Sequence, residues 1–306
     1  MLANPDHEIV LAEHDPVVRH EALSQEWYVS LVLGDGPRAR AGLAVLTEMA
    51  VLTRHPFVED MVPFWSFQLH LIEGRLDACQ EAVNLMAERW TRHGWPSLEV
   101  YTASAQFEMA REAGLLGFLT EDALTPEPGN VPAVRAGLAA IVAVETGNRA
   151  AAFDLVEQRG RNGFVDVPDD GALPVARSAW SEAAAFARHD IAAQHWYDLL
   201  VVDPDLHFAT GGWYIGSTTR NLGLLASALG RDEDATHWFE RAVIEHERMQ
   251  SPPWLARGLL DWAEHDMGHG RTDSAVAHVD RAFEAIGDLP LTALLDRATR
   301  LRAESR

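Results

Sequence analysis

The sequence predicts an all-α fold built from helical hairpins, and three observations support this prediction. Apolar residues recur at spacings of three and four along most of the chain, which is the period of an amphipathic helix. Alanine is abundant and runs of β-branched residues are short, which also favours helix. Short turn-like stretches recur at nearly regular intervals, and such self-similarity is typical of stacked structural repeats.

Seven short turns divide the chain. Their markers are Gly34, Gly74, Gly114, Gly147, His189, Gly230 and Gly270, which lie 40, 40, 33, 42, 41 and 40 residues apart. Each turn lies between two predicted helices of about fifteen residues. A lone hairpin cannot bury its apolar face, whereas stacked hairpins bury one continuous core. We therefore predict a single domain over residues 1–306, a solenoid of about seven hairpins with a C-terminal capping helix at 290–304.

The residues around each turn support this prediction. Glycine at the turn ends the first helix by accepting a left-handed backbone conformation. An aspartate soon afterwards helps to start the second helix near the positive end of its dipole; these aspartates are Asp35, Asp77, Asp190, Asp232 and Asp273. Small residues then let the second helix pack closely; these are Ala39, Ala78, Ala152, Ala235 and Ala275.

Charge and cysteine content exclude several classes of function. The net charge is −21, with 46 acidic residues against 25 basic ones, and every basic residue is arginine. Binding to nucleic acid depends on cationic side chains that displace counterions, so we expect no nucleic-acid partner. A lone cysteine, Cys79, rules out an intramolecular disulfide, and we interpret it as a core thiol.

The sequence also indicates a cytoplasmic location. The first residues, MLANPDHEIVLAEHDP, lack the basic start and apolar run of a signal peptide. No window approaches eighteen uninterrupted apolar residues, so we expect no membrane partner and no membrane span.

Motifs that carry chemistry are missing. Because the chain has no lysine, a phosphate-binding loop and Schiff-base chemistry are both excluded. Neither a G-x-S-x-G nucleophile elbow nor an H-E-x-x-H zinc motif occurs. We therefore predict no cofactor, and a binding protein rather than an enzyme.

The stretch LLDWAEHDMGHG (259–270) is the strongest candidate for a metal site. His265 and His269 are one helical turn apart, as metal ligands can be. Gly268 and Gly270 flank His269, so the helix is expected to end there, and a histidine at that end needs no metal. We therefore predict no metal at this pair, while His265 and Asp266 remain unusual as polar residues where hairpin packing expects apolar ones.

The segment NLGLLASALGRDEDATHWFERAV (221–243) resembles a tetratricopeptide repeat. Leu222, Gly223, Gly230, Ala235, Phe239 and Ala242 lie at that family's spacing. Thr219 and Ala226 occupy two positions where the family has aromatic residues, and the neighbouring repeats exceed the family's usual 34 residues. The resemblance implies a right-handed superhelix with a concave groove.

Nearly the whole chain is similar to the helical-repeat region that follows the ATPase module in actinobacterial regulators of the LuxR and maltose-activator types and in some adenylate-cyclase fusions. The similarity is carried by GSTTRNLGLLASALGR (216–231), HWFERAVIEHERMQSPPWLARGLLDWA (237–263) and GNRAAAFDLV (147–156). The chain lacks the phosphate-binding loop and a recognisable helix-turn-helix, so ATPase and DNA-binding activity do not carry over.

Projection of the tetratricopeptide pattern onto each hairpin suggests which side chains face the groove. The candidates are Tyr28, Trp65, Tyr101, Glu108, Arg111, Glu182, Arg220, Arg257 and Glu264, together with Trp180, Trp213, Asp261 and His265. Aromatic and arginine side chains in one groove suit a polar ligand or a peptide, through stacking and charge-assisted hydrogen bonds.

Three functions are compatible with these patterns. The leading hypothesis is a module of a regulatory or signalling system that binds a peptide, a partner protein or a small effector in its groove. An alternative is an enzyme or assembly protein of bacterial specialised metabolism, in which Asp261, His265 and Glu264 are the acid and base groups. A self-assembling scaffold, formed by homo-oligomerisation, is the third.

Overall fold

The computed structural model describes residues 15–96, 98–118, 132–165, 167, 173–210 and 213–305, with residues 132–136 described for their backbone alone. These residues are helical almost throughout, so the predicted all-α class is confirmed. The first residues, on which the expectation about a signal peptide rests, lie outside this description. Within the described ranges, no helix combines the length and the apolar character needed to cross a membrane.

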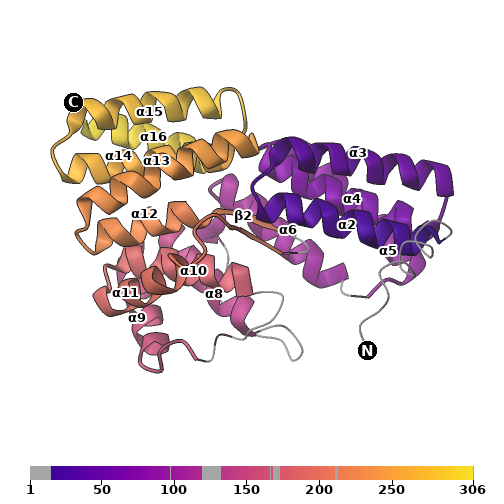
Figure 1. The fold of residues 1–306 in the computed structure, drawn as a ribbon, viewed down its shortest axis with the longest axis horizontal. Helices are drawn as coiled ribbons and strands as arrows, with labels where there is room; N and C mark the ends of the chain where they lie inside the picture. Colours follow the sequence, from indigo (N-terminus) through magenta and orange to yellow (C-terminus); the bar gives the residue numbers. More distant parts are fainter. Residues whose placement is uncertain are drawn as a thin grey trace.

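Consecutive helices pack as antiparallel pairs (Figure 1). The helices of the first half are α2 (Pro16–Val32), α3 (Gly36–Thr53), α4 (Pro56–Ile72), α5 (Leu76–His93) and α6 (Leu98–Glu112), followed by the 3-10 turn η1 (Leu116–Phe118). Those of the second half are α8 (Pro132–Glu145), α9 (Arg149–Gly160), α10 (Leu173–Ala187), α11 (Asp190–Leu200), α12 (Thr218–Ala228), α13 (Asp232–Met249), α14 (Pro252–Gly268), α15 (Thr272–Ile286) and α16 (Thr292–Glu304).

The seven turns close with the same pair of backbone hydrogen bonds. At the first turn, the Gly34 N–H donates to the Leu31 carbonyl and the Asp35 N–H donates to the Ser30 carbonyl, a pattern that ends a helix through a left-handed residue. The six marker glycines have φ between 62° and 75°. At the remaining turn the left-handed residue is Arg188, with φ 53°, immediately before the His189 marker.

A small side chain is fully buried where each second helix meets its partner. Ala39, Ala152, Ala235 and Ala275 have no exposed surface. In α5 this position belongs to Cys79 rather than to Ala78, because Cys79 is fully buried and Ala78 is half-buried. Burial raises the pKa of the Cys79 thiol to about 12, so the side chain is a protonated core group.

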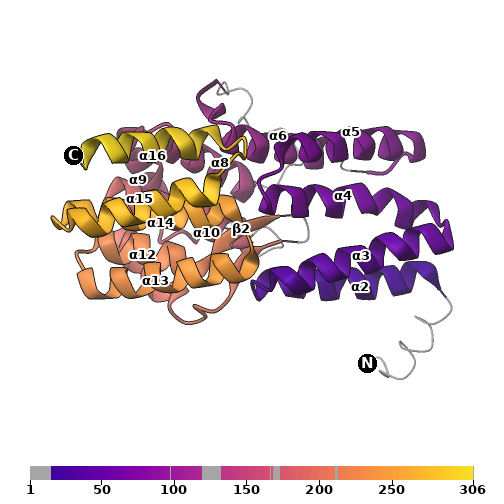
Figure 2. The same ribbon diagram turned by 90° about the horizontal axis from the view of Figure 1, so that it is seen from above.

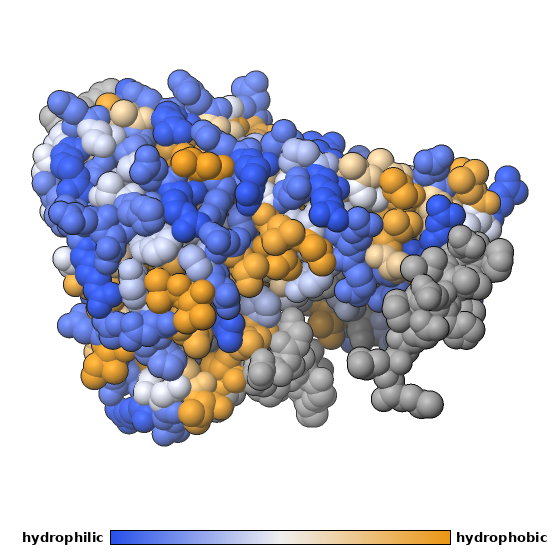
Figure 3. All heavy atoms as spheres, in the orientation of Figure 1, coloured by the Kyte–Doolittle hydropathy of each residue, from blue (hydrophilic) through white to orange (hydrophobic). Residues whose placement is uncertain are grey.

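A short antiparallel sheet interrupts the helices, which the sequence did not predict. Strands β1 (His207–Ala209) and β2 (Tyr214–Ser217) pair between α11 and α12. Both strands are completely buried, so they lack the alternation of apolar and polar residues that reveals a half-exposed strand. Figure 3 shows apolar side chains gathered near the middle of the molecule, where this hairpin crosses, beside a mainly hydrophilic surface on the C-terminal helices.

Helices far apart in the sequence lie against one another. Figure 2 shows α2–α5 and α12–α16 as two neighbouring stacks. The stacks are joined by contacts of α3 with α13 and of α4 with α14. Helix α6, which follows the first stack, contacts α16. Arg248 donates to the carbonyls of Leu33 and Gly34, at 2.6 and 3.1 Å, and the Ser251 hydroxyl donates to the Ile72 carbonyl at 2.7 Å. The last hairpins therefore cover the turn ends of the first ones.

Close packing at Gly223 generates the first testable prediction. A Cβ atom at Gly223 would lie 2.6 Å from Cδ1 of buried Phe239, on the partner helix of the same hairpin. We expect Gly223→Ala to lower the free energy of unfolding by about 1–3 kcal/mol, since α12 and α13 must move apart. Urea denaturation followed by circular dichroism measures this change.

Gly268→Ala is the matched control, because a Cβ atom there would meet no atom within 4 Å. This helical substitution should be neutral or stabilising by about 0.5–1 kcal/mol. Equal effects of the two substitutions would contradict the packing argument.

Candidate functional site

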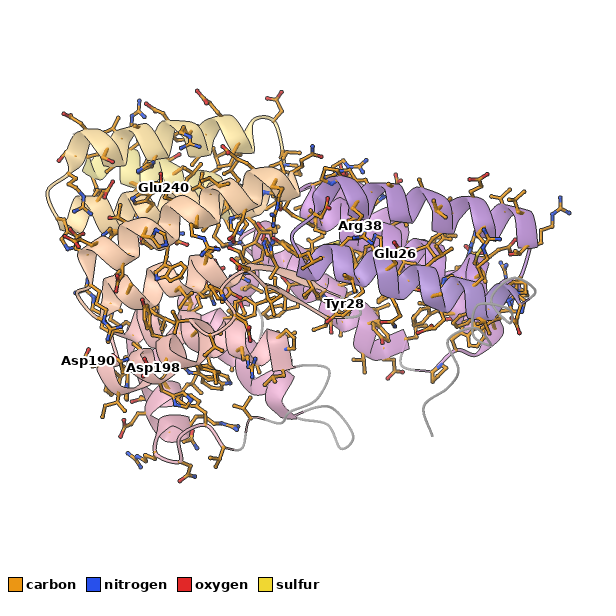
Figure 4. The ribbon with its side chains drawn as sticks, in the orientation of Figure 1. Glu26, Tyr28, Arg38, Asp190, Asp198 and Glu240 are labelled. Atoms are coloured by element: carbon orange, nitrogen blue, oxygen red, sulfur yellow. The ribbon has the colours of Figure 1, made fainter. Side chains whose placement is uncertain are left out.

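The predicted groove residues separate into an aromatic cluster and a charged network. The aromatic cluster contains Trp65, which lies 4.9 Å from Trp27 between ring centroids, and Tyr101, which stacks on Trp213 at 5.7 Å. Tyr28 lies on α2 and its hydroxyl donates to the Ala209 carbonyl at 3.1 Å (Figure 4). These aromatic side chains are buried or partly buried in the core.

Trp180 on α10 is separate from this cluster. It is 1% exposed and packs against Phe164, at 5.9 Å between ring centroids. Trp180 is therefore a core residue, and it does not face a binding surface.

The charged candidates meet at the centre of the molecule. Arg111 on α6 donates from Nε to Glu145 at 2.6 Å and from Nη2 to both carboxylate oxygens of Glu182 at 3.4 Å. Arg220 on α12 donates from Nη2 to Glu182 at 2.9 Å and from Nε to Asp261 at 2.6 Å. Glu182 of α10 therefore bridges two arginines from different hairpins.

Two further arginines extend the same network. Arg257 on α14 donates to Glu145 at 2.9 Å and to Glu112 at 2.8 Å. Arg297 on α16 donates to Asp261 at 2.7 Å. Arg297 also bonds Glu264, the remaining acidic candidate on α14, at 3.0 Å. The arginine network, as we call this set, comprises Arg111, Arg220, Arg257 and Arg297 with Glu112, Glu145, Glu182, Asp261 and Glu264.

The indole of Trp254 lies at the centre of the arginine network. The guanidinium carbons of Arg111, Arg220 and Arg257 lie 5.3–5.6 Å from the centroid of its ring, within the range of cation–π attraction. Gly216 makes room for this ring, because a Cβ atom there would lie 2.6 Å from Trp254 Cε3, and its φ of 92° also disfavours any other residue.

The arginines keep the buried carboxylates ionised. Burial alone raises the pKa of Glu182, but Arg220 and Arg111 outweigh it and hold the pKa well below its usual range. Burial likewise acts against Arg257 and Arg111 at Glu145, whose net pKa is lowered. These carboxylates are therefore fixed acceptors and not proton donors at neutral pH.

Glu108 behaves differently from its neighbours. This α6 residue is partly buried, and burial raises the pKa of its carboxyl to about 7 against the opposing effect of Arg111. Glu112 and Glu145 add repulsion that raises the pKa further. Glu108 is thus the acid of this region that titrates near neutral pH.

A cavity of about 620 Å³ adjoins the arginine network. Its charged lining includes Glu145, Glu182, Arg220, Arg257, Asp261, Glu264 and Arg297, with Arg149, Arg188, Asp296 and Arg300. Its apolar lining includes Val144, Phe186, Leu224 and Phe239. The volume is typical of small-molecule sites.

Two buried donors beside this cavity lack acceptors. Arg220 and Arg257 are each 2% exposed, yet Nη1 of Arg220 and Nε of Arg257 have no hydrogen-bond partner among the described residues. An unsatisfied buried donor is costly, and more so on a charged group.

Several residues of the site were not predicted from the sequence. Glu112 and Glu145 lie in the last turns of their helices, and their proximity to Gly114 and Gly147 was the one available signal. Arg297 comes from the capping helix, to which no groove position was assigned. Trp254 is not among the predicted groove residues.

No family model matches this chain, and no curated protein sequence matches it. The site must therefore be interpreted from its own chemistry.

The pairing of Arg257 leads to the second prediction. Arg257→Met should lower the free energy of unfolding by about 3–5 kcal/mol, because it leaves Glu112 buried without its cation. Arg161→Met is the control, since Arg161 is 73% exposed and pairs with Glu157, four residues earlier. Its change should stay within about 0.5 kcal/mol in the same urea titration. Similar losses for both variants would show that the buried pairs are not structural.

Glu108 provides a prediction about pH. The pKa of the Glu108 carboxyl rises from 4.5 in the unfolded chain to about 7 in the folded protein. The native state therefore loses stability as the pH increases from 4.5 to about 7, and the whole loss remains at higher pH. Glu108→Gln should therefore stabilise the protein by on the order of 1–3 kcal/mol at pH 8 and have little effect at pH 4.

Thermal or urea unfolding at the two pH values measures this difference. Glu99→Gln on the exposed side of the same helix is the matched control and should show no such pH dependence. A Glu108→Gln effect equal at both pH values would contradict the assignment.

Proposed function

We propose that this chain is a helical-repeat binding module that holds a small polar effector in the cavity beside the arginine network. The proposal includes a right-handed superhelix of tetratricopeptide type whose last hairpins pack against its first ones. The single observation that carries the proposal is the cavity lining, to which Arg149 and Arg188 add exposed cations beside the charges of the arginine network.

The lining favours a ligand with an anionic group. Glu182, Asp261 and Glu145 are already paired with Arg111, Arg220, Arg257 and Arg297, so these charges offset each other. Arg149 and Arg188 also line the cavity, and no ion pair joins either to a described carboxylate. A carboxylate or phosphate would therefore find exposed cations in the cavity lining.

The structural placement of the aromatic candidates gives less support to a helical peptide in an open groove. Trp65 is buried among other rings, and Tyr28 is already bonded to the β-hairpin. An enzyme that uses Asp261 and Glu264 for proton transfer is also less supported. Arg297 binds both carboxylates and helps to lower the pKa of Glu264 against the effect of burial.

Membership of a cytoplasmic regulatory or signalling system remains part of the proposal. It is supported by the resemblance of residues 216–263 to the repeat regions of bacterial regulators. In such a setting, occupancy of the cavity would stabilise the contacts among the hairpins that line it, because α10, α12, α14 and α16 all contribute to its wall.

Binding can be tested with a defined panel of compounds. Inorganic phosphate, citrate, glucose 6-phosphate and glutamate are the anionic members, and spermidine is the cationic comparison. We expect at least one anionic compound, and not spermidine, to raise the midpoint of thermal unfolding, with the affinity measured by calorimetry. A panel without any stabilising anion would argue against the proposal.

The double variant Arg149→Gln, Arg188→Gln tests the location. Both arginines are exposed, so the fold should persist, and affinity should fall by about 10-fold or more. Arg161→Gln removes a similarly exposed cation away from the cavity and should bind as the original protein does. Unchanged binding by the double variant would place the ligand elsewhere.

A further inference from the structure

Two histidines and an aspartate from different hairpins converge at the end of α14. His265 lies in the last turn of α14, His269 is its C-terminal capping residue, and Asp232 begins α13. Each offers one ligand atom, and the three atoms lie within 4.8 Å of one another. Asp232 is 33 residues from the nearer histidine, so only the packing of the two hairpins brings this set together.

The hydrogen bonds of both imidazoles leave the same nitrogen available. His269 Nδ1 lies 2.8 Å from the carbonyl oxygen of His265, which can only accept, so Nδ1 carries the proton and Nε2 the lone pair. His265 Nδ1 lies 2.9 Å from Ser227 Oγ, which can accept its proton in the same way. Metal-binding histidines usually have their second nitrogen held by such a bond.

The available atoms point to one location. His265 Nε2 lies 2.8 Å from Asp232 Oδ1, and His269 Nε2 lies 3.8 Å from that same oxygen. A tetrahedral zinc ion with bonds of about 2.0–2.1 Å separates its ligand atoms by about 3.3 Å, between these two distances.

The surrounding charges orient the aspartate. Arg271 Nη1 donates to Oδ2 of Asp232 at 3.0 Å, and Arg271 Nη2 lies 2.9 Å from Oδ1, the oxygen that also faces the two histidines. Arg271 Nε is held by Asp266 at 2.8 Å, so this cation is itself balanced.

We propose that Asp232, His265 and His269 form a binding site for a divalent transition metal ion of the zinc class. Two imidazole nitrogens and one carboxylate oxygen are a ligand set that zinc accepts, and three protein ligands leave a coordination position for water. His265 also lines the cavity, so the metal would lie at its wall. The site does not depend on ligand binding in that cavity.

The experiment uses the full chain, stripped of metal by chelation and titrated separately with Co²⁺ and Zn²⁺. We expect one Co²⁺ ion per chain with visible absorption bands, displaced by Zn²⁺, and zinc retained after dialysis in elemental analysis. His269→Ala and Asp232→Asn should abolish the bands while circular dichroism keeps its helical signal, because these side chains are 39% and 43% exposed.

Two variants complete the test. Ser227→Ala should weaken metal affinity by about 10- to 100-fold, since Ser227 orients His265 without touching the metal. His237→Ala, which removes an exposed histidine of α13, should bind metal as the original protein does. The proposal is overturned if the stripped protein binds no metal, or if His269→Ala and Asp232→Asn bind it unchanged.

Discussion

The packing of three arginines around the ring of Trp254 is the interaction on which the rest of the structure depends. Arg111, Arg220 and Arg257 come from three different hairpins, and each would repel the others without the carboxylates between them. Glu182 bridges two of these arginines. Because removal of one member leaves an opposite charge buried, the set constrains how all the participating helices are placed.

This constraint explains why the molecule closes rather than forming an open groove. Arg257 of α14 pairs with Glu112 of α6 and with Glu145 of α8, so these ion pairs join the last hairpins to earlier helices. Buried ion pairs contribute little net stability compared with apolar packing, but they disfavour arrangements in which a charge lacks its partner. The network therefore acts mainly on the choice of arrangement, while the alanine-rich helix contacts supply the packing energy.

The two proposed sites share His265, near the end of α14. His265 belongs to the metal-site candidate through Nε2 and to the cavity wall through its position. The cavity combines offset charge pairs with the exposed cations Arg149 and Arg188, which is an arrangement suited to an anionic ligand. Arg271, in the turn between α14 and α15, bonds Asp266 and Asp232. Asp266, one of the two unusual polar residues of this repeat, therefore helps to hold the arginine that contacts the proposed metal ligand Asp232.

The sequence by itself determined the helices and their turns, because helical periodicity and left-handed glycines act within a few residues. It also indicated that residues such as Glu182, Arg220 and Asp261 would share one side of the repeats. It did not reveal β1 and β2, which are too short and too buried for a periodic signal. Tertiary structure alone decided that these charges pair across hairpins instead of facing solvent. It also placed Asp232 beside two histidines of α14, because contacts between distant segments depend on how whole hairpins pack.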